Sequence, residues 1–370
     1  MISPVPLAAI PQPDPLPLPG APSLLHGLLL LTFFLHVIPM NLVLGGAVIG
    51  AVARLRGGPH PPALARFVAK ALPTAIAATI TFGIAPLLFL QVLYGRVFFV
   101  SSILMAWFWL GVVPALVLAY ALGYRQALAP VPGRGGRVAA WAIVLLFAAI
   151  AFAYSSNMSL MLRPERFVES YNAEPRGLHL SLQGGALVPR YLHMVLSALA
   201  VAGLAVTVHG LLRRWTDPAY GAWAVRHGSL WFCVATILNV ATGMWWLVAL
   251  PREVLLRFMG QDLAATGALV IGASAGLGAL GAMAGALYAR DPKRLLQAGV
   301  AGTLLALAAM VIVRDRVRLG FLEQAGFEPL SWVEPQWSAI ALFALALAAG
   351  LATIGWMVVV LARAHNAPPA

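Results

Sequence analysis

The sequence predicts an all-α membrane protein, a polytopic bundle of about nine transmembrane helices. Of its 370 residues, 61% are hydrophobic and 10% are charged, whereas soluble domains are about half apolar and about a quarter charged. The mean hydropathy is +0.88, and nine segments contain the roughly 20 apolar residues that a membrane-spanning helix needs. These observations exclude a soluble globular enzyme, a disordered chain and a fibrous protein.

The single cysteine and the positive net charge exclude further kinds of site. Cys233 is the single cysteine, which excludes a disulfide framework, a cysteine-rich metal site and the C-x-x-C-H attachment site of c-type haem. The formal charge of +12 does not indicate nucleic-acid binding, because no run of five basic residues occurs. Arginines that anchor helix ends at the bilayer surface account for it.

The predicted spans divide the chain into a helical domain and two tails. The nine spans cover approximately 24–53, 65–94, 98–123, 137–161, 190–212, 223–250, 263–289, 294–313 and 337–362. Residues 1–23 are proline-rich and carry no basic residue, so we expect an extended extracytoplasmic tail rather than a signal peptide. Residues 24–363 form the transmembrane domain, and 364–370 form a cytoplasmic tail.

The positions of the basic residues predict the orientation. With the N-terminus outside, the inner connections and the C-terminus hold thirteen of the 24 Lys and Arg residues and only two acids, Asp217 and Asp291. Positive residues favour the cytoplasmic side, so we expect N-out and C-in. The long connections 162–189 and 314–336 then lie outside, where aromatic residues such as Phe167 suit short interfacial helices or a docking surface.

Acidic residues are absent from the predicted spans. All 12 Asp and Glu residues are expected in connections or at helix ends. Because intramembrane acids mark ion pathways and proton relays, the sequence predicts neither a proton-coupled transporter nor a proton-carrying carboxylate chain inside this subunit.

Histidines are the polar residues that enter the spans. His26 and His36 lie on the first span, His193 and His209 lie on the fifth, and His227 opens the sixth. Neutral imidazole is the commonest protein ligand for metals. A haem needs only one or two axial ligands, whereas structural zinc needs four ligands and calcium needs oxygen ligands. Histidines without acids or further cysteines therefore favour haem.

The spacing of the histidines groups them by depth. His26 and His36 lie about 15 Å and about 80° apart along one helix, so they cannot ligate one iron. His209 lies about 24 Å from His193, beside His227 near the inner surface. His36 and His193 are the leading candidates for iron ligands, because an unpaired buried imidazole is costly. For His209 and His227, ligation and interfacial hydrogen bonding both stay open.

Three motifs taken together resemble subunit I of the cytochrome bd-type oxidase superfamily. They are FFLHVIPMNLVLG at 33–45, FGIA at 82–85 and RYLHMVLS at 190–197. The resemblance implies that His36 stands at a haem ligand of the oxygen-reducing pair and that His193 ligates a low-spin haem b. Nine spans with the N-terminus outside also match that subunit.

Several departures from that family are equally clear. Gln91 stands where the family has an acid, and the stretch near Val270 lacks the family's methionine ligand, with Met283 about three turns away. The connection 251–262 is much shorter than the family's quinol-binding loop. Arg314-Asp-Arg-Val-Arg318 replaces the signature after the eighth span, and that span lacks the carboxylate ligand. The resemblance therefore implies a divergent member without the quinol site.

The sequence thus predicts a haem b-binding subunit of a respiratory electron-transfer complex in the bacterial inner membrane. We expect one to three haems b and electron exchange with periplasmic c-type cytochromes or another membrane or periplasmic subunit. His36 and His193 are the expected axial ligands. His26 is a third candidate, as a ligand or as a donor to a propionate, while His209 and His227 could hold an inner haem.

Arginines at the outer ends of the spans complete the predicted site, and two alternatives stay open. Arg96, Arg190 and Arg252 are candidate partners of haem propionates, because guanidinium matches carboxylate geometry.

One alternative function is a bd-like terminal oxygen reductase, an oxidoreductase that takes protons from outside or from a partner subunit. The other is a haem-free membrane anchor for a redox complex, in which the histidines make interhelical hydrogen bonds. A transporter is the weakest candidate.

Overall fold

The computed structural model describes residues 16–128, 133–182, 185–328, 330 and 332–366, and within these ranges it contains helices and no strand. Nine helices of the described part are long and apolar enough to cross a membrane. The predicted all-α class and the predicted span number are therefore confirmed. The chain is a multi-pass membrane protein.

The nine long helices are α1 (Pro22–Ala53), α2 (Pro61–Leu104), α3 (Ala106–Leu128), α4 (Gly133–Met161), α6 (Leu187–Arg213), α7 (Pro218–Val248), α9 (Leu263–Ala286), α10 (Lys293–Gln324) and α11 (Trp337–Asn366). Short helices lie in two connections: η2 (Pro164–Arg166), α5 (Phe167–Ala173), α8 (Arg252–Leu256) and the π-helical η3 (Arg257–Gln261). The connection 162–189, where short interfacial helices or a docking surface were expected, contains the short helix α5. The helices α8 and η3 were not predicted.

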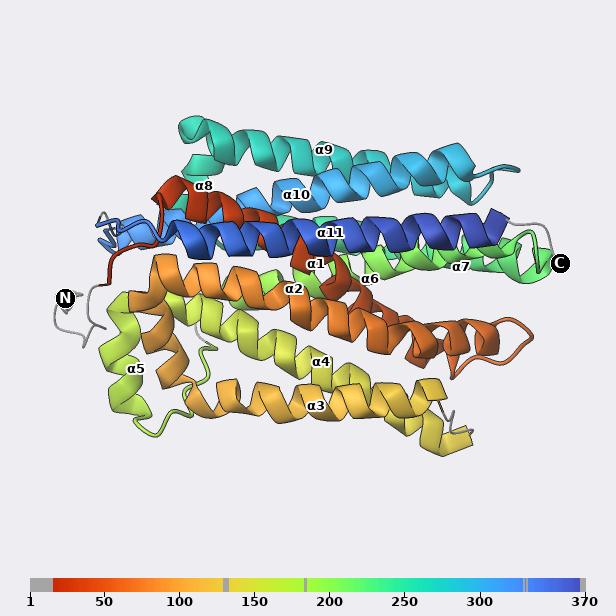
Figure 1. Ribbon diagram of the computed structural model, residues 1–370, viewed down its shortest axis with the longest axis horizontal. Coiled ribbons are helices and arrows are strands. Elements are labelled where there is room, and N and C mark those ends of the chain that lie inside the picture. Colours follow the sequence, from red (N-terminus) through yellow and green to blue (C-terminus); the bar gives the residue numbers. More distant parts are fainter. Residues whose placement is uncertain (1–15, 129–132, 183–184, 329, 331, 367–370) are drawn as a thin grey trace.

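The long helices run between two ends of the bundle, as Figure 1 shows. One end carries α5, α8 and the start of α1, and we call it the α5 end. The other carries the α1–α2, α6–α7 and α9–α10 connections and the last turn of α11, and we call it the C-terminal end. The start of α1 and the last turn of α11 lie at opposite ends, as an odd number of spans requires.

The helices form two groups that meet along α1 and α6. The first group is α1 to α4, and the second comprises α6, α7, α9 and α10, with the closest packing in the pairs α1–α2, α6–α7 and α9–α10. Helix α11 lies across the front of Figure 1. Its residues Trp337–Met357 include no buried side chain. An edge-to-face contact joins Phe343 of α11 to Phe89 of α2, with ring centroids 5.2 Å apart.

The second and third predicted spans have a different boundary in the structure. Helix α2 continues to Leu104 across a kink at Tyr94, where φ is −128° and ψ is 22°. Residues 98–104 therefore belong to α2, and α3 begins only at Ala106. The prediction was wrong here because the apolar run is continuous, so composition does not indicate where the backbone turns.

Helix α10 corrects two further predictions. The helix continues to Gln324, so Arg314–Arg318 are helical rather than part of an outer connection over 314–336. Asp315 lies well inside this helix and is 1% exposed, so the expectation that every acid lies in a connection or at a helix end was wrong. The physical reason is tertiary: His26 of α1 lies against the carboxylate and stabilises it.

Glycines bring the central helices into backbone contact. A Cβ atom at Gly228 of α7 would lie 2.5 Å from the carbonyl oxygen of Gly203 of α6. A Cβ atom at Gly45 of α1 would lie 2.0 Å from the carbonyl oxygen of Ala198 of α6. Small residues at such positions let membrane helices approach closely. These contacts hold α1, α6 and α7 together in the middle and toward the C-terminal end.

Candidate functional site

His36 of α1 is held against the backbone of α2. Its Nδ1 donates a hydrogen bond to the carbonyl oxygen of Thr79, at 3.0 Å. Since a carbonyl oxygen only accepts, this bond places the proton of the neutral ring on Nδ1 and leaves the Nε2 lone pair available. Gly83 follows one turn later, and a Cβ atom there would lie 2.9 Å from Cε1 of His36. The glycine therefore provides the room that the ring occupies.

His193 of α6 is held in the same way against α7. Its Nδ1 donates to the carbonyl oxygen of Asn239, at 3.1 Å. A Cβ atom at Gly243 would lie 3.0 Å from Cε1 of His193. The Trp246 ring lies one turn beyond, with its centroid 5.9 Å from that of the imidazole. In both cases the glycine comes four residues after the acceptor, and we call this combination the histidine–carbonyl–glycine arrangement.

The two arrangements create two separate ligand positions. One lies between α1 and α2 and the other between α6 and α7. The structure gives the Nε2 atoms of His36 and His193 no hydrogen-bond partner among the described residues. A histidine that ligates a metal almost always donates its other ring N–H to a carbonyl or carboxylate, which fixes the tautomer and the ring orientation. Both histidines are thus prepared for ligation through Nε2.

The helix segments that carry and face both histidines are exposed or half-buried. The segments 77–85 of α2, 190–197 of α6 and 237–248 of α7 include no buried residue. Even the residues of α7 that face His193, including Asn239 and Gly243, are only half-buried. Apolar and only partly buried surroundings beside an available Nε2 match what a flat macrocycle needs next to its ligand. The residues present therefore fit a haem group.

Positive charge collects at the α5 end near His36. The guanidinium of Arg314 lies over the ring of Phe33, 4.2 Å from its centroid, and Phe33 itself contacts the His36 ring. Within the described part of the chain no carboxylate forms an ion pair with Arg314. Arg318 lies one turn further along the same helix, with its guanidinium over the ring of Tyr94. Arg314 is half-buried and Arg318 is buried, and guanidinium groups at such positions suit an anionic group.

Arg190 was predicted as a propionate partner, and the structure places it at the start of α6. Its Nη2 donates to the carbonyl oxygen of Ser155, at 2.5 Å, and to the hydroxyl of Ser159. Sequence analysis missed Arg314 because it assigned that residue to a connection. The other two predicted partners also lie toward the α5 end: Arg96 follows the kink of α2 and Arg252 begins α8.

His26 is hydrogen-bonded to the buried carboxylate of Asp315. Its Nε2 lies 2.9 Å and 3.0 Å from the two carboxylate oxygens of Asp315. Arg318 lies one turn further along α10, with its guanidinium 3.9 Å from the same carboxylate and over the ring of Tyr94. The Nε2 atom that would face an iron is therefore engaged with an acid. The contact joins α1 to α10.

His209 and His227 lie at the C-terminal end and are engaged by aromatic rings. His209 stacks on Phe67, with centroids 3.6 Å apart. His227 stacks on Trp223, with centroids 4.5 Å apart, and its Nε2 accepts a hydrogen bond from Nε1 of Trp231 at 3.1 Å. Neither ring is held in a histidine–carbonyl–glycine arrangement. These contacts favour a packing role over ligation of an inner haem.

The described residues include no group of three or more His, Cys, Asp or Glu side chains that could hold a metal ion. The candidate chemistry is thus that of isolated imidazole ligands. No family model matches the sequence, and no curated protein is significantly similar to it. The functional argument therefore depends on the geometry of the two histidines.

Proposed function

We propose that this protein is a haem b-binding subunit of a membrane electron-transfer complex. His36 and His193 would each hold one haem through Nε2. The repeated histidine–carbonyl–glycine arrangement carries this proposal, because two independent helix pairs present an oriented imidazole with an available Nε2.

The carbonyl partners support the choice of ligands. A hydrogen bond from Nδ1 raises the basicity of Nε2 and limits rotation of the ring. The glycines at 83 and 243 leave room beside each ring, where a side chain would collide with it. When bound, haem supplies reversible one-electron chemistry whose potential depends on the axial ligand, burial and nearby charge.

Arginines at the α5 end are the proposed partners of the haem propionates. Arg314 lies over Phe33, one turn before His36, and Arg190 opens the helix that carries His193. Guanidinium groups bind carboxylates in a planar, bidentate geometry. Positive charge near an oxidised haem also favours its reduction, so these arginines would raise the potential.

The same end of the molecule is the proposed site of electron exchange. Both histidines, Arg190 and Arg314 lie in the half of the bundle toward the α5 end. In the orientation favoured by the positive residues, this end faces the periplasm of a bacterium whose inner membrane holds the chain. A c-type cytochrome or a partner redox subunit would dock there. We also propose a divergent relationship to the cytochrome bd-type oxidase superfamily.

A terminal oxygen reductase is the second candidate. The buried pair of Asp315 and His26 favours it, because the imidazole is 27% exposed while the carboxylate is 1% exposed. Such a pair provides titratable groups between the surface and the interior, which oxygen reduction requires. Carbon monoxide added to the reduced protein separates the candidates, since it binds only to iron with an open coordination position.

A reduced-minus-oxidised optical spectrum of the detergent-purified protein tests the proposal, with a pyridine haemochrome assay for stoichiometry. We expect a b-type spectrum. The variants His36→Ala and His193→Ala should each lose about one haem per chain, because each removes one axial ligand. His60→Ala and His227→Phe are the matched controls, and their haem content should equal that of the parent protein.

Two results would contradict the proposal. One is a parent protein without haem absorbance, purified under conditions that retain b-type haem, which would support the haem-free anchor. The other is unchanged haem content in both His36→Ala and His193→Ala.

A further inference from the structure

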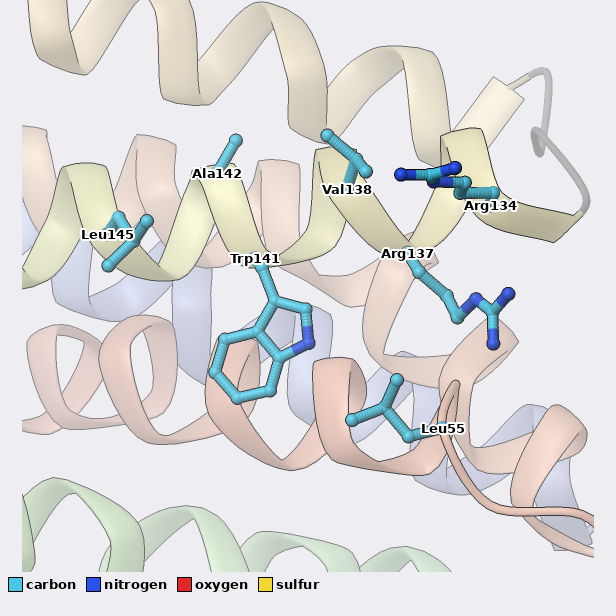
Figure 2. A pocket seen from close by; sticks show the side chains of 7 residues that line it. All are labelled: Leu55, Arg134, Arg137, Val138, Trp141, Ala142 and Leu145. Carbon is cyan, nitrogen blue, oxygen red and sulfur yellow. The ribbon is translucent and has the colours of Figure 1, made fainter.

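A groove lies at the C-terminal end of the bundle, where the chain leaves α1 and where α4 begins. It has a volume of about 490 Å³. Leu55 lines it from the α1 side, and the other lining residues all come from α4, as Figure 2 shows. The lining residues of α4 are Arg134, Arg137, Val138, Trp141, Ala142 and Leu145.

The lining residues form one continuous face of α4. They recur at intervals of three and four residues, which places them on the same side of a helix. From Arg134 to Leu145 this face is about 16 Å long at 1.5 Å per residue. In Figure 2 both guanidinium groups lie at the end next to the start of α4, and the apolar side chains extend away from them. The groove therefore has a basic mouth and an apolar floor.

The charge at the mouth is uncompensated. Arg134 and Arg137 are exposed, and neither belongs to any ion pair of the described residues. Trp141 lies half-buried between this mouth and the apolar floor. Tryptophan is enriched at the level of the lipid headgroups. The mouth is thus at the depth where a bilayer places its phosphates.

We infer that the groove binds one anionic phospholipid of the surrounding bilayer. The phosphate pairs with Arg134 and Arg137, since guanidinium matches phosphate geometry. An acyl chain lies along Val138, Ala142 and Leu145, parallel to α4. Basic sites between transmembrane helices recognise anionic headgroups in this way. Two positive charges require a net negative ligand, and the apolar floor requires a chain attached to it.

Native mass spectrometry of the full chain in detergent tests this inference. Delipidated protein is titrated with phosphatidylglycerol and, in parallel, with phosphatidylcholine of the same acyl chains. We expect one site that binds phosphatidylglycerol about tenfold more tightly. Inorganic phosphate at the same concentration should not displace the lipid, because it has no acyl chain to bury.

Matched double variants locate the site. Arg134→Gln with Arg137→Gln should abolish the preference for phosphatidylglycerol. Arg290→Gln with Arg294→Gln removes the same charge from exposed positions at the same end of the bundle and should preserve it. If the first double variant does not fold, the single variants Arg134→Gln and Arg137→Gln provide the same test, each with a smaller loss.

Three results would overturn the inference. Equal affinity for the two lipids would show that charge plays no part. An equal loss in both double variants would indicate general attraction to a basic surface. Displacement of the lipid by inorganic phosphate would indicate a simple anion site. None of these results bears on haem binding, because none of the residues that line the groove belongs to the proposed haem sites.

Discussion

The two halves of the α6–α7 pair use glycine for different purposes. Toward the C-terminal end, a Cβ atom at Gly228 would lie 2.5 Å from the backbone of Gly203, so the helices are in backbone contact. Toward the α5 end, a Cβ atom at Gly243 would instead lie 3.0 Å from the ring of His193. The same residue type thus joins two helices in one half and admits an imidazole between them in the other.

The difference between the halves extends to packing. Residues 198–210 of α6 include many buried side chains, whereas 190–197 include none. On α7, buried residues end at Thr236. The tightly packed half provides rigidity, and the less buried half provides an imidazole oriented by the carbonyl of Asn239. Rigid support next to an oriented ligand is what a bound cofactor requires.

A side-chain contact between His26 and Asp315 joins α1 to α10 toward the α5 end, and Asp315→Ala tests how much stability depends on it. This change leaves His26 and Arg318 without their buried carboxylate. Breaking a buried ion pair by removing one partner costs about 3–5 kcal/mol. We expect a large fall in the thermal midpoint in detergent. Glu323→Ala is the control, since Glu323 is 57% exposed in its ion pair with Arg257, and it should have almost no effect.

Gly228→Ala tests the tightly packed half. The added Cβ atom meets backbone atoms of α6 that cannot move independently. Overpacking of this kind costs about 1–3 kcal/mol, so the thermal midpoint should fall clearly. Gly267→Ala on α9 is a matched control, because no atom lies within 4 Å of a Cβ atom built there. Equal stability of the two variants would refute the proposed backbone contact.

Gly243→Ala tests the less buried half and sharpens the comparison. Its Cβ atom meets the edge of the His193 ring, so we expect the ring to reorient at a cost in stability smaller than that of Gly228→Ala. The reduced α-band should shift or broaden, and the midpoint potential should change, because ligand orientation tunes the iron. An unchanged spectrum would argue against His193 as the ligand.

His227→Phe should have the smallest effect. The variant keeps a flat ring on Trp223 and loses the hydrogen bond from Trp231, which contributes about 1 kcal/mol. Haem content and midpoint potentials should equal those of the parent protein. A lost haem would show that the C-terminal end also carries a ligand and that the contrast between the two ends is incomplete.

Much of the fold follows from composition and periodicity alone. Nine apolar stretches of spanning length predict nine helices, because backbone polar groups in a bilayer must be satisfied within each segment. The choice of His36 and His193 as leading candidates also came from the sequence, through their depth in the first and fifth spans. Neither inference required knowledge of which helices are neighbours.

The contacts of the candidate site depend on which helices are neighbours. No local signal indicates that Thr79 and Asn239 supply the carbonyl partners, or that Gly83 and Gly243 face the imidazoles, because these contacts join residues more than 40 positions apart. The charged stretch around Asp315 suggested a connection, and only its contact with His26 shows why the helix continues. The sequence by itself determined the helices and their candidate ligands. The tertiary structure decided which ring nitrogens are engaged, because a buried polar group is satisfied by whichever helix packs against it.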